Sequence, residues 1–264
     1  DPWWRLLPFA GSSARRFLGP GSLRRRFLLT HLLRLPPRTY LRALFVLIVR
    51  RFTELQRKIV PLSSRDVVAV QEVVDAVDAH FGSHTASRLP VIAVYSAYQL
   101  LIQHVGRYAG KQLADLLSHT TADRRTHNVG DVQVLGADGA FWEAVEVKHL
   151  IAITPDLVLD AYLKIQDTPV TRYYLLTTAQ PPTAQQTEVD DATALCRAEH
   201  GCEMIVNGVL PTLQYYLRLL PRAYDFLTTY TENLNAEYRA STVIKEQHLE
   251  SWQEIQERLD AATE

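Results

Sequence analysis

The chain has 264 residues, 47% hydrophobic and 22% charged, with a formal net charge of −1. This composition is typical of a globular protein with one large core or two modest ones, and no apolar run reaches membrane-spanning length. Two cysteines, Cys196 and Cys202, exclude a disulfide framework or a zinc-binding spacing, so we expect free buried thiols in a reducing compartment.

The first 60 residues carry a strong excess of positive charge. Thirteen Arg and Lys side chains stand against Asp1 and Glu54, a net charge of +11, so the rest of the chain carries −12. Such a split favours an anionic partner, nucleic acid before a membrane surface. A solvated arginine-rich face or a loosely ordered fragment end is the open alternative. Because the only methionine is Met204, we expect this region to be truncated.

The first part of the chain is predicted to be helical. Residues 23–60 show helical spacing, interrupted by a pair of prolines, and the helix that follows ends near Gly82. A longer helical pattern opens at Pro90 and continues to about Leu117. We expect residues 1–89 to form a basic, mainly helical region of the same domain as the rest.

The middle of the chain alternates strands with helices. Strands are predicted at 129–135 and 141–148, joined by the hairpin signal Asp138-Gly139. The later elements are a helix at 154–166 begun by Thr154-Pro155, a strand at 172–178, a helix at 183–200 closed by Gly201, a strand at 202–206, and helices from Pro211 through Leu259. The predicted fold class is α/β, with a mixed β-sheet flanked by helices. Its core spans residues 90–210, and residues 211–264 add C-terminal helices.

The hairpin brings two acidic residues together. If Asp138-Gly139 fills the two central turn positions, Asp131 stands directly across from Glu146. Side chains alternate along a strand, so Glu146 and Lys148 share one face with Gln133. Val145 and Val147 then point the other way, into a core.

This arrangement favours metal-dependent chemistry. Adjacent carboxylates repel unless a proton or a cation separates them, and Mg²⁺ prefers carboxylate oxygens and water. Lys148 is one of only five lysines beside 23 arginines, and lysine is the cation that shifts its pKa readily. Next to the ion it could orient or deprotonate a water and stabilise phosphate charge. A polar, salt-bridged hairpin face is the alternative.

Gly130-Asp131 followed by Glu146-Val147-Lys148 resembles the signature of the PD-(D/E)xK nuclease superfamily, and residues 119–149 are similar to the SacI-type restriction enzymes. The resemblance implies a restriction-endonuclease-like fold, with Mg²⁺, or Mn²⁺ as a substitute, held by Asp131, Glu146 and the Val147 carbonyl. It makes Lys148 the catalytic lysine. The chain departs from the signature at Gly130, which replaces a proline. A third acidic ligand is not obvious, with Asp115 or Asp123 as candidates.

The function implied by the resemblance is that of a type II restriction endonuclease cutting double-stranded DNA. It also implies a homodimer, a prokaryotic cytoplasmic location without a membrane partner, and a DNA methyltransferase acting alongside. Two alternatives stay open. One is a structure-specific repair or recombination nuclease of the same superfamily, and the other is a non-catalytic nucleic-acid-binding protein.

Further polar residues flank the hairpin. Arg124, Arg125 and His127 precede the first strand and, with Gln133, are candidate DNA contacts, although an ordinary charged loop fits equally well. His149 is predicted to be structural. Lys164 has Asp156 and Asp160 at helical spacing, so we expect ion pairing within that helix.

Overall fold

The computed structural model describes residues 37–56, 68–83, 86–116, 129–180, 185–240 and 243–261. The chain divides into two units, residues 1–57 and residues 58–264. Helix α2 (Pro37–Gln56) belongs to the first unit and begins at the second of the paired prolines, where the fixed φ of proline suits a first helical turn. Within the described residues no helix has both the length and the hydropathy to cross a membrane.

The second unit is built around a five-stranded mixed sheet with strand order β1-β2-β3-β4-β5. The strands are β1 (Gln112–Leu113), β2 (Val132–Leu135), β3 (Phe141–Lys148), β4 (Arg172–Thr177) and β5 (Glu203–Gly208). Neighbours from β1 to β3 are antiparallel, whereas β3, β4 and β5 are parallel. The predicted class, α/β with a mixed sheet flanked by helices, is confirmed.

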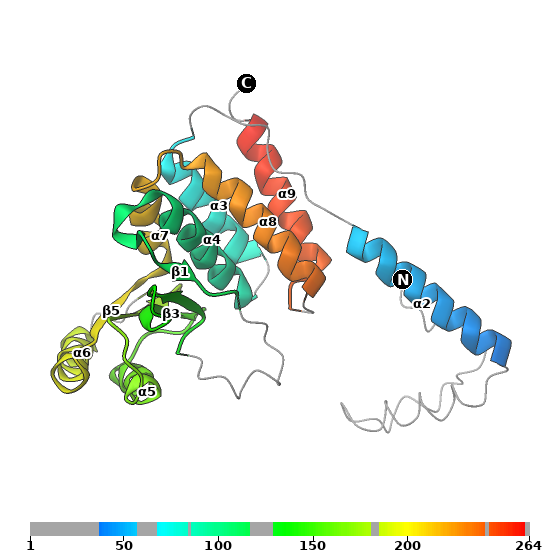
Figure 1. Cartoon of the computed structure of the whole chain (residues 1–264). Helices are drawn as coiled ribbons and strands as arrows, with labels where there is room; N and C mark the ends of the chain where they lie inside the picture. The colour runs from blue at the N-terminus through cyan, green and yellow to red at the C-terminus, as the bar shows by residue number, and fades with distance from the viewer. Residues whose placement is uncertain are drawn as a thin grey trace. The chain divides into compact units, whose positions relative to one another are not determined.

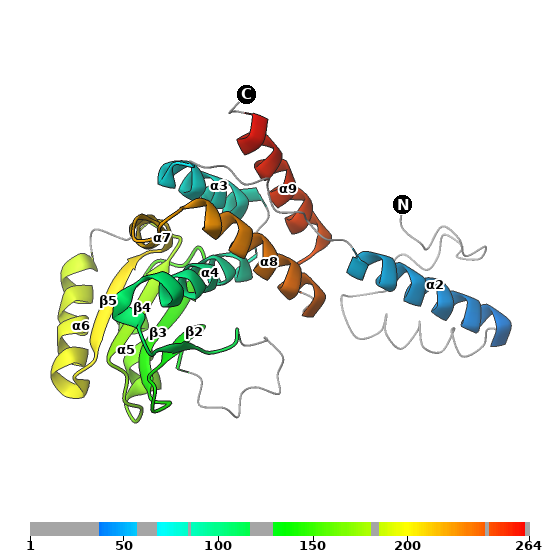
Figure 2. The same ribbon diagram turned by 45° about the horizontal axis from the view of Figure 1, so that its top comes forward.

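Helices cover both faces of this sheet (Figure 1). The helices described in the second unit are α3 (Val70–Ser83), α4 (Arg88–His104), the short 3₁₀ helix η3 (Gly106–Tyr108), α5 (Pro155–Ile165), α6 (Gln186–His200), α7 (Val209–Arg218), α8 (Tyr224–Ala240) and α9 (Glu246–Ala261). Figure 2 shows α5 and α6 on one side of the sheet and α4 on the other. Helices α5 and α6 are the crossovers that join the parallel strands.

Alternation along the strands divides the buried side chains into two cores. Val145 and Val147 of β3 join the core formed with α3, α4, α7, α8 and α9, as predicted. Ala144 of β3 and Tyr173 of β4 join the core formed with α5 and α6. The sheet therefore has one face toward α4 and one toward α5, and Glu146 has the parity of the α5 face.

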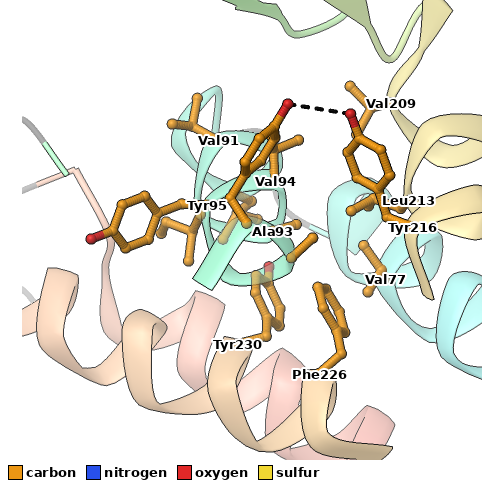
Figure 3. Close-up of a cluster of buried hydrophobic side chains, with 14 of the residues drawn as sticks. Val77, Val91, Ala93, Val94, Tyr95, Val209, Leu213, Tyr216, Phe226 and Tyr230 are labelled. Carbon is orange, nitrogen blue, oxygen red and sulfur yellow. Dashed lines mark hydrogen bonds between the residues drawn. The ribbon is translucent and has the colours of Figure 1, made fainter. Parts of the chain in front are cut away.

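The larger core is mostly a helical assembly (Figure 3). Val77 of α3 and Leu213 of α7 lie near Tyr216, while Phe226 and Tyr230 come from α8. The rings of Phe226 and Tyr230 are stacked with centroids 5.8 Å apart. Helix α3, which precedes the predicted nuclease core in sequence, is thus packed into the second unit.

Two predicted helix boundaries are wrong. The helix expected to reach about Leu117 ends at His104, because Val105 adopts an extended conformation and caps the helix by bonding to the Leu101 carbonyl. The chain then uses Gly110 in a left-handed conformation and adds the short strand β1 to the sheet. Helix α7 begins at Val209 rather than Pro211, and proline is tolerated in this first turn because amide groups there have no intrahelical acceptor.

Other boundary predictions are confirmed. The Thr154 hydroxyl accepts a hydrogen bond from the Leu157 amide at 3.3 Å, capping α5 at the expected position. Gly201 closes α6 with φ of 78°, a conformation that glycine adopts without strain. Cys196 and Cys202 are both free and buried.

Candidate active site

The β2–β3 hairpin has the predicted register. Val132 pairs with Val145, and Gln133 pairs with Ala144. The turn itself differs from the prediction, because the Gly139 amide bonds to the Gly136 carbonyl and leaves Ala137 and Asp138 at its centre.

This turn would shift the register by one residue, but a β-bulge reverses the shift. Leu135 pairs with Phe141, whereas Val134 pairs with Glu143, so Trp142 is an extra residue on β3. The bulge therefore restores the pairing of β2 with β3 that we predicted from a turn at Asp138-Gly139. Without the bulge, Glu146 would be shifted by one residue relative to the segment that carries Asp131.

Asp131 immediately precedes β2 and is fastened to β3. Its Oδ2 atom accepts a hydrogen bond from the Val147 backbone amide at 2.9 Å. The side-chain amide of Gln133, a candidate DNA contact, donates to the Gly130 carbonyl at 3.1 Å. Within the chain, Gln133 thus helps to shape the backbone in front of β2.

Gly130 has a physical reason to replace the proline of the signature. A Cβ atom at this position would lie 2.8 Å from the Val145 carbonyl oxygen and 3.1 Å from its carbonyl carbon. Both are backbone atoms of the central strand β3, so they have little freedom to move away. A residue with a Cβ, proline included, does not fit this backbone.

Glu146 lies between two lysines. Its Oε1 atom accepts from Lys148 Nζ at 2.8 Å, and its Oε2 atom accepts from Lys164 Nζ at 2.7 Å. Burial by itself would raise the pKa of Glu146, but the charges and hydrogen bonds of Lys164 and Lys148 outweigh it, so the pKa is lowered. Glu146 is therefore held as a carboxylate.

Lys164 is a site residue that the sequence interpretation missed. It was expected to pair with Asp156 and Asp160 along its own helix, but its ammonium reaches the sheet and contacts Glu146. The signal that could have found it is its place in the last turn of α5, the helix that crosses back over the face carrying Glu146.

Tyr173 is a second missed residue. It lies on β4 opposite Ala144 and its side chain is fully buried on the α5 face. Burial, followed by the negative charges of Glu146 and Asp131, raises the pKa of its hydroxyl well above the ordinary value. The charges of both carboxylates therefore act on the same buried hydroxyl, which accepts and donates no hydrogen bond within the described residues.

His149 makes a structural contact, as predicted. Its Nδ1 atom is hydrogen-bonded to the Thr178 hydroxyl at 2.9 Å, and burial lowers its pKa. The same hydroxyl accepts from the Leu150 amide at 2.8 Å. Leu150 has φ of 57°, a left-handed conformation that is rare for leucine. These bonds fix the chain where it leaves β3.

The remaining predicted residues do not join the cluster or cannot be placed. Arg124, Arg125, His127 and Asp123 lie outside the described residues. Asp115 follows β1. Burial of Tyr95 on α4 raises the pKa of that tyrosine, and the negative charge of Asp115 raises it further. In the part of the chain that the structure describes, no group of three or more Asp, Glu, His or Cys side chains is arranged to hold a metal ion.

The opposite face of β3 carries an independent polar cluster. Glu143 is fully buried and accepts hydrogen bonds from the Tyr98 hydroxyl at 3.2 Å and the Tyr108 hydroxyl at 3.0 Å. Arg107 forms an ion pair with it. Tyr98 is further bonded to Tyr216, the contact dashed in Figure 3. This cluster anchors β3 to α4 and lies on the side away from Glu146.

The donors around Glu146 suit a hard cation. Asp131 and Glu146 offer carboxylate oxygens, and the Val147 carbonyl lies between Glu146 and Lys148 in the chain. Mg²⁺ is commonly bound by one or two carboxylates, with water or phosphate oxygens completing its six ligands. Asp131, Glu146 and the Val147 carbonyl are therefore the groups here whose chemistry suits a magnesium ion.

No protein-family model matches the chain, and no curated protein sequence matches it.

Proposed function

We propose that this chain is a Mg²⁺-dependent nuclease that hydrolyses DNA phosphodiester bonds with Asp131, Glu146 and Lys148. The observation that carries the proposal is the bond of the Asp131 carboxylate to the Val147 amide at 2.9 Å, at the residue between Glu146 and Lys148, with the Lys148 ammonium 2.8 Å from Glu146. A carboxylate pair with an adjacent lysine is a suitable set for metal-assisted hydrolysis.

Each residue has a distinct task in this proposal. Asp131 and Glu146, together with the Val147 carbonyl, would hold Mg²⁺, and Mn²⁺ would substitute. The bound ion would activate a water and offset the negative charge of the phosphate. Lys148, next to the ion, would orient that water or stabilise the charge on the phosphate oxygens. The bond from the Val147 amide would keep Asp131 in position throughout.

The finer assignment is to a type II restriction endonuclease with a restriction-endonuclease-like fold. It is supported by the resemblance of Gly130-Asp131 and Glu146-Val147-Lys148 to the PD-(D/E)xK signature and of residues 119–149 to SacI-type enzymes. This assignment implies a homodimer on a palindromic double-stranded site, a companion DNA methyltransferase and a prokaryotic cytoplasmic location. Arg124, Arg125, His127 and Gln133 are the proposed DNA contacts.

One observation favours a different function. Both oxygens of Glu146 already accept hydrogen bonds from lysines, as they would in a structural ion-pair network. A non-catalytic nucleic-acid-binding protein with a structural acidic hairpin would look the same in the absence of metal. A repair nuclease that acts on branched DNA is the other alternative, and it would use the same three residues.

One cleavage experiment separates the three. The purified chain is incubated with Mg²⁺ and supercoiled plasmid, linear duplex or a four-way junction, and with Ca²⁺ as the control ion. Discrete plasmid bands support the restriction assignment, and cleavage confined to the junction supports repair. A folded chain that binds DNA but cuts none of these substrates would contradict the nuclease proposal.

A further inference from the structure

Two of the chain's five lysines contact the same carboxylate. Lys148 lies two residues from Glu146 on the same strand, while Lys164 reaches it from α5. They bond to different oxygens, at 2.8 Å and 2.7 Å. The Glu146 side chain is 16% exposed, so few water molecules compete for these positions. The two ammonium groups therefore already surround the carboxylate with positive charge.

This charge opposes a divalent cation. A magnesium ion sits about 2.1 Å from a carboxylate oxygen, so it would lie only about 4–5 Å from an ammonium bonded to the same group. Like charges at that distance repel unless one of them moves. Binding of the cation therefore favours displacement of an ammonium from Glu146.

Lys164 is the better placed of the two to move. Its side chain is 38% exposed, against 28% for Lys148, and it extends from the last turn of a surface-covering helix. A long flexible stem lets its ammonium swing into water at little cost.

We propose that Lys164 is a positioning residue that occupies Oε2 of Glu146 in the metal-free protein and leaves it when a divalent cation binds. This inference rests on the proposed metal site and adds a regulatory property to it. Lys164 offsets the charge of the Glu146 carboxylate in the absence of metal, and it lowers the affinity for the cation. The site then fills only when the ion can displace Lys164.

The inference is tested by Mn²⁺ binding to the full chain without DNA, measured by electron paramagnetic resonance of the free ion. We expect Lys164→Met to bind Mn²⁺ about tenfold more tightly than the wild type, because one positive charge near the ion is gone. Lys164→Arg keeps the charge and adds a bidentate contact, so it should bind no more tightly than the wild type. Lys245→Met, at an exposed lysine remote in sequence from the site, is the matched control and should be unchanged.

The outcomes separate this inference from the proposed function. If Glu146→Gln abolishes binding but Lys164→Met binds with unchanged or weaker affinity, the role of Lys164 is wrong and the metal site stands. If neither the wild type nor Lys164→Met binds Mn²⁺, or if Glu146→Gln binds as well as the wild type, both are wrong. Thermal unfolding of each variant checks that it is folded.

Discussion

The Val147 backbone amide donates a hydrogen bond to the Asp131 carboxylate at 2.9 Å. This bond joins the residue in front of β2 to the residue between Glu146 and Lys148 on β3. An acidic side chain outside the regular strand pairing is thereby held beside the other members of the site. Hydrogen bonds to a charged group are stronger than those between neutral groups. This contact therefore gives the Asp131 carboxylate a donor and also fixes its position.

The close approach of Gly130 to β3 predicts the effect of a single methyl group. Gly130→Ala would place a Cβ 2.8 Å from the Val145 carbonyl oxygen, and the hairpin must shift to relieve the clash. We expect a loss of about 1–3 kcal/mol in the free energy of unfolding, measured by urea denaturation. Gly106→Ala is the control, because its Cβ would meet no atom within 4 Å. Equal stability of Gly130→Ala and the wild type would contradict this.

The lysines around Glu146 predict a pH dependence of stability. The folded-state pKa of Glu146 lies below its ordinary value of 4.5, because Lys164 and Lys148 outweigh the effect of burial. The ionised carboxylate therefore stabilises the folded state above pH 4.5, and this contribution is lost as the pH falls through the lowered pKa. Relative to Glu146→Gln, the wild type should have the higher melting temperature at pH 7, and the difference should shrink toward pH 3.

A matched variant tests whether the loss of stability at low pH is caused by protonation of Glu146. Glu199 is exposed on α6, so Glu199→Gln should follow the wild type at every pH. A melting temperature of Glu146→Gln that stays parallel to the wild type from pH 7 to pH 3 would refute the lowered pKa.

The cluster around Glu143 predicts a larger effect on stability than any surface ion pair. Glu143→Leu would leave the buried hydroxyls of Tyr98 and Tyr108 without their acceptor and remove the partner of Arg107. We expect the free energy of unfolding to fall by about 3–5 kcal/mol. Glu203→Gln breaks a half-exposed pair with Arg172 and should cost under about 1 kcal/mol. Similar losses in the two variants, measured in urea, would contradict the buried role of Glu143.

The local pattern of the sequence was sufficient to predict the helix ends that capping residues define. Thr154-Pro155 begins α5 and Gly201 ends α6, because caps and left-handed glycines act within a few residues. Alternation predicted that Val145 and Val147 face a core. The register of Glu146 was also right, but only because the bulge at Trp142 compensated for the misplaced turn.

What the sequence did not reveal depends on contacts between distant segments. Lys164 contacts Glu146 from α5, 18 residues later in the chain, and no local spacing rule links the two residues. The helix expected to continue past His104 instead gives way to β1, whose pairing with β2 no local pattern announces. Glu143 is indistinguishable by alternation from a core position, yet its burial depends on three partners from α4 and η3.

The central claim is tested most directly by the single-turnover rate of Mg²⁺-dependent DNA cleavage in Lys148→Met, compared with Lys245→Met. If Lys148 acts on the attacking water or the phosphate, its loss should slow cleavage by at least about 100-fold in a chain that stays folded, and the control should keep the wild-type rate. Wild-type cleavage by folded Lys148→Met would contradict the assignment of Asp131, Glu146 and Lys148 as a nuclease site.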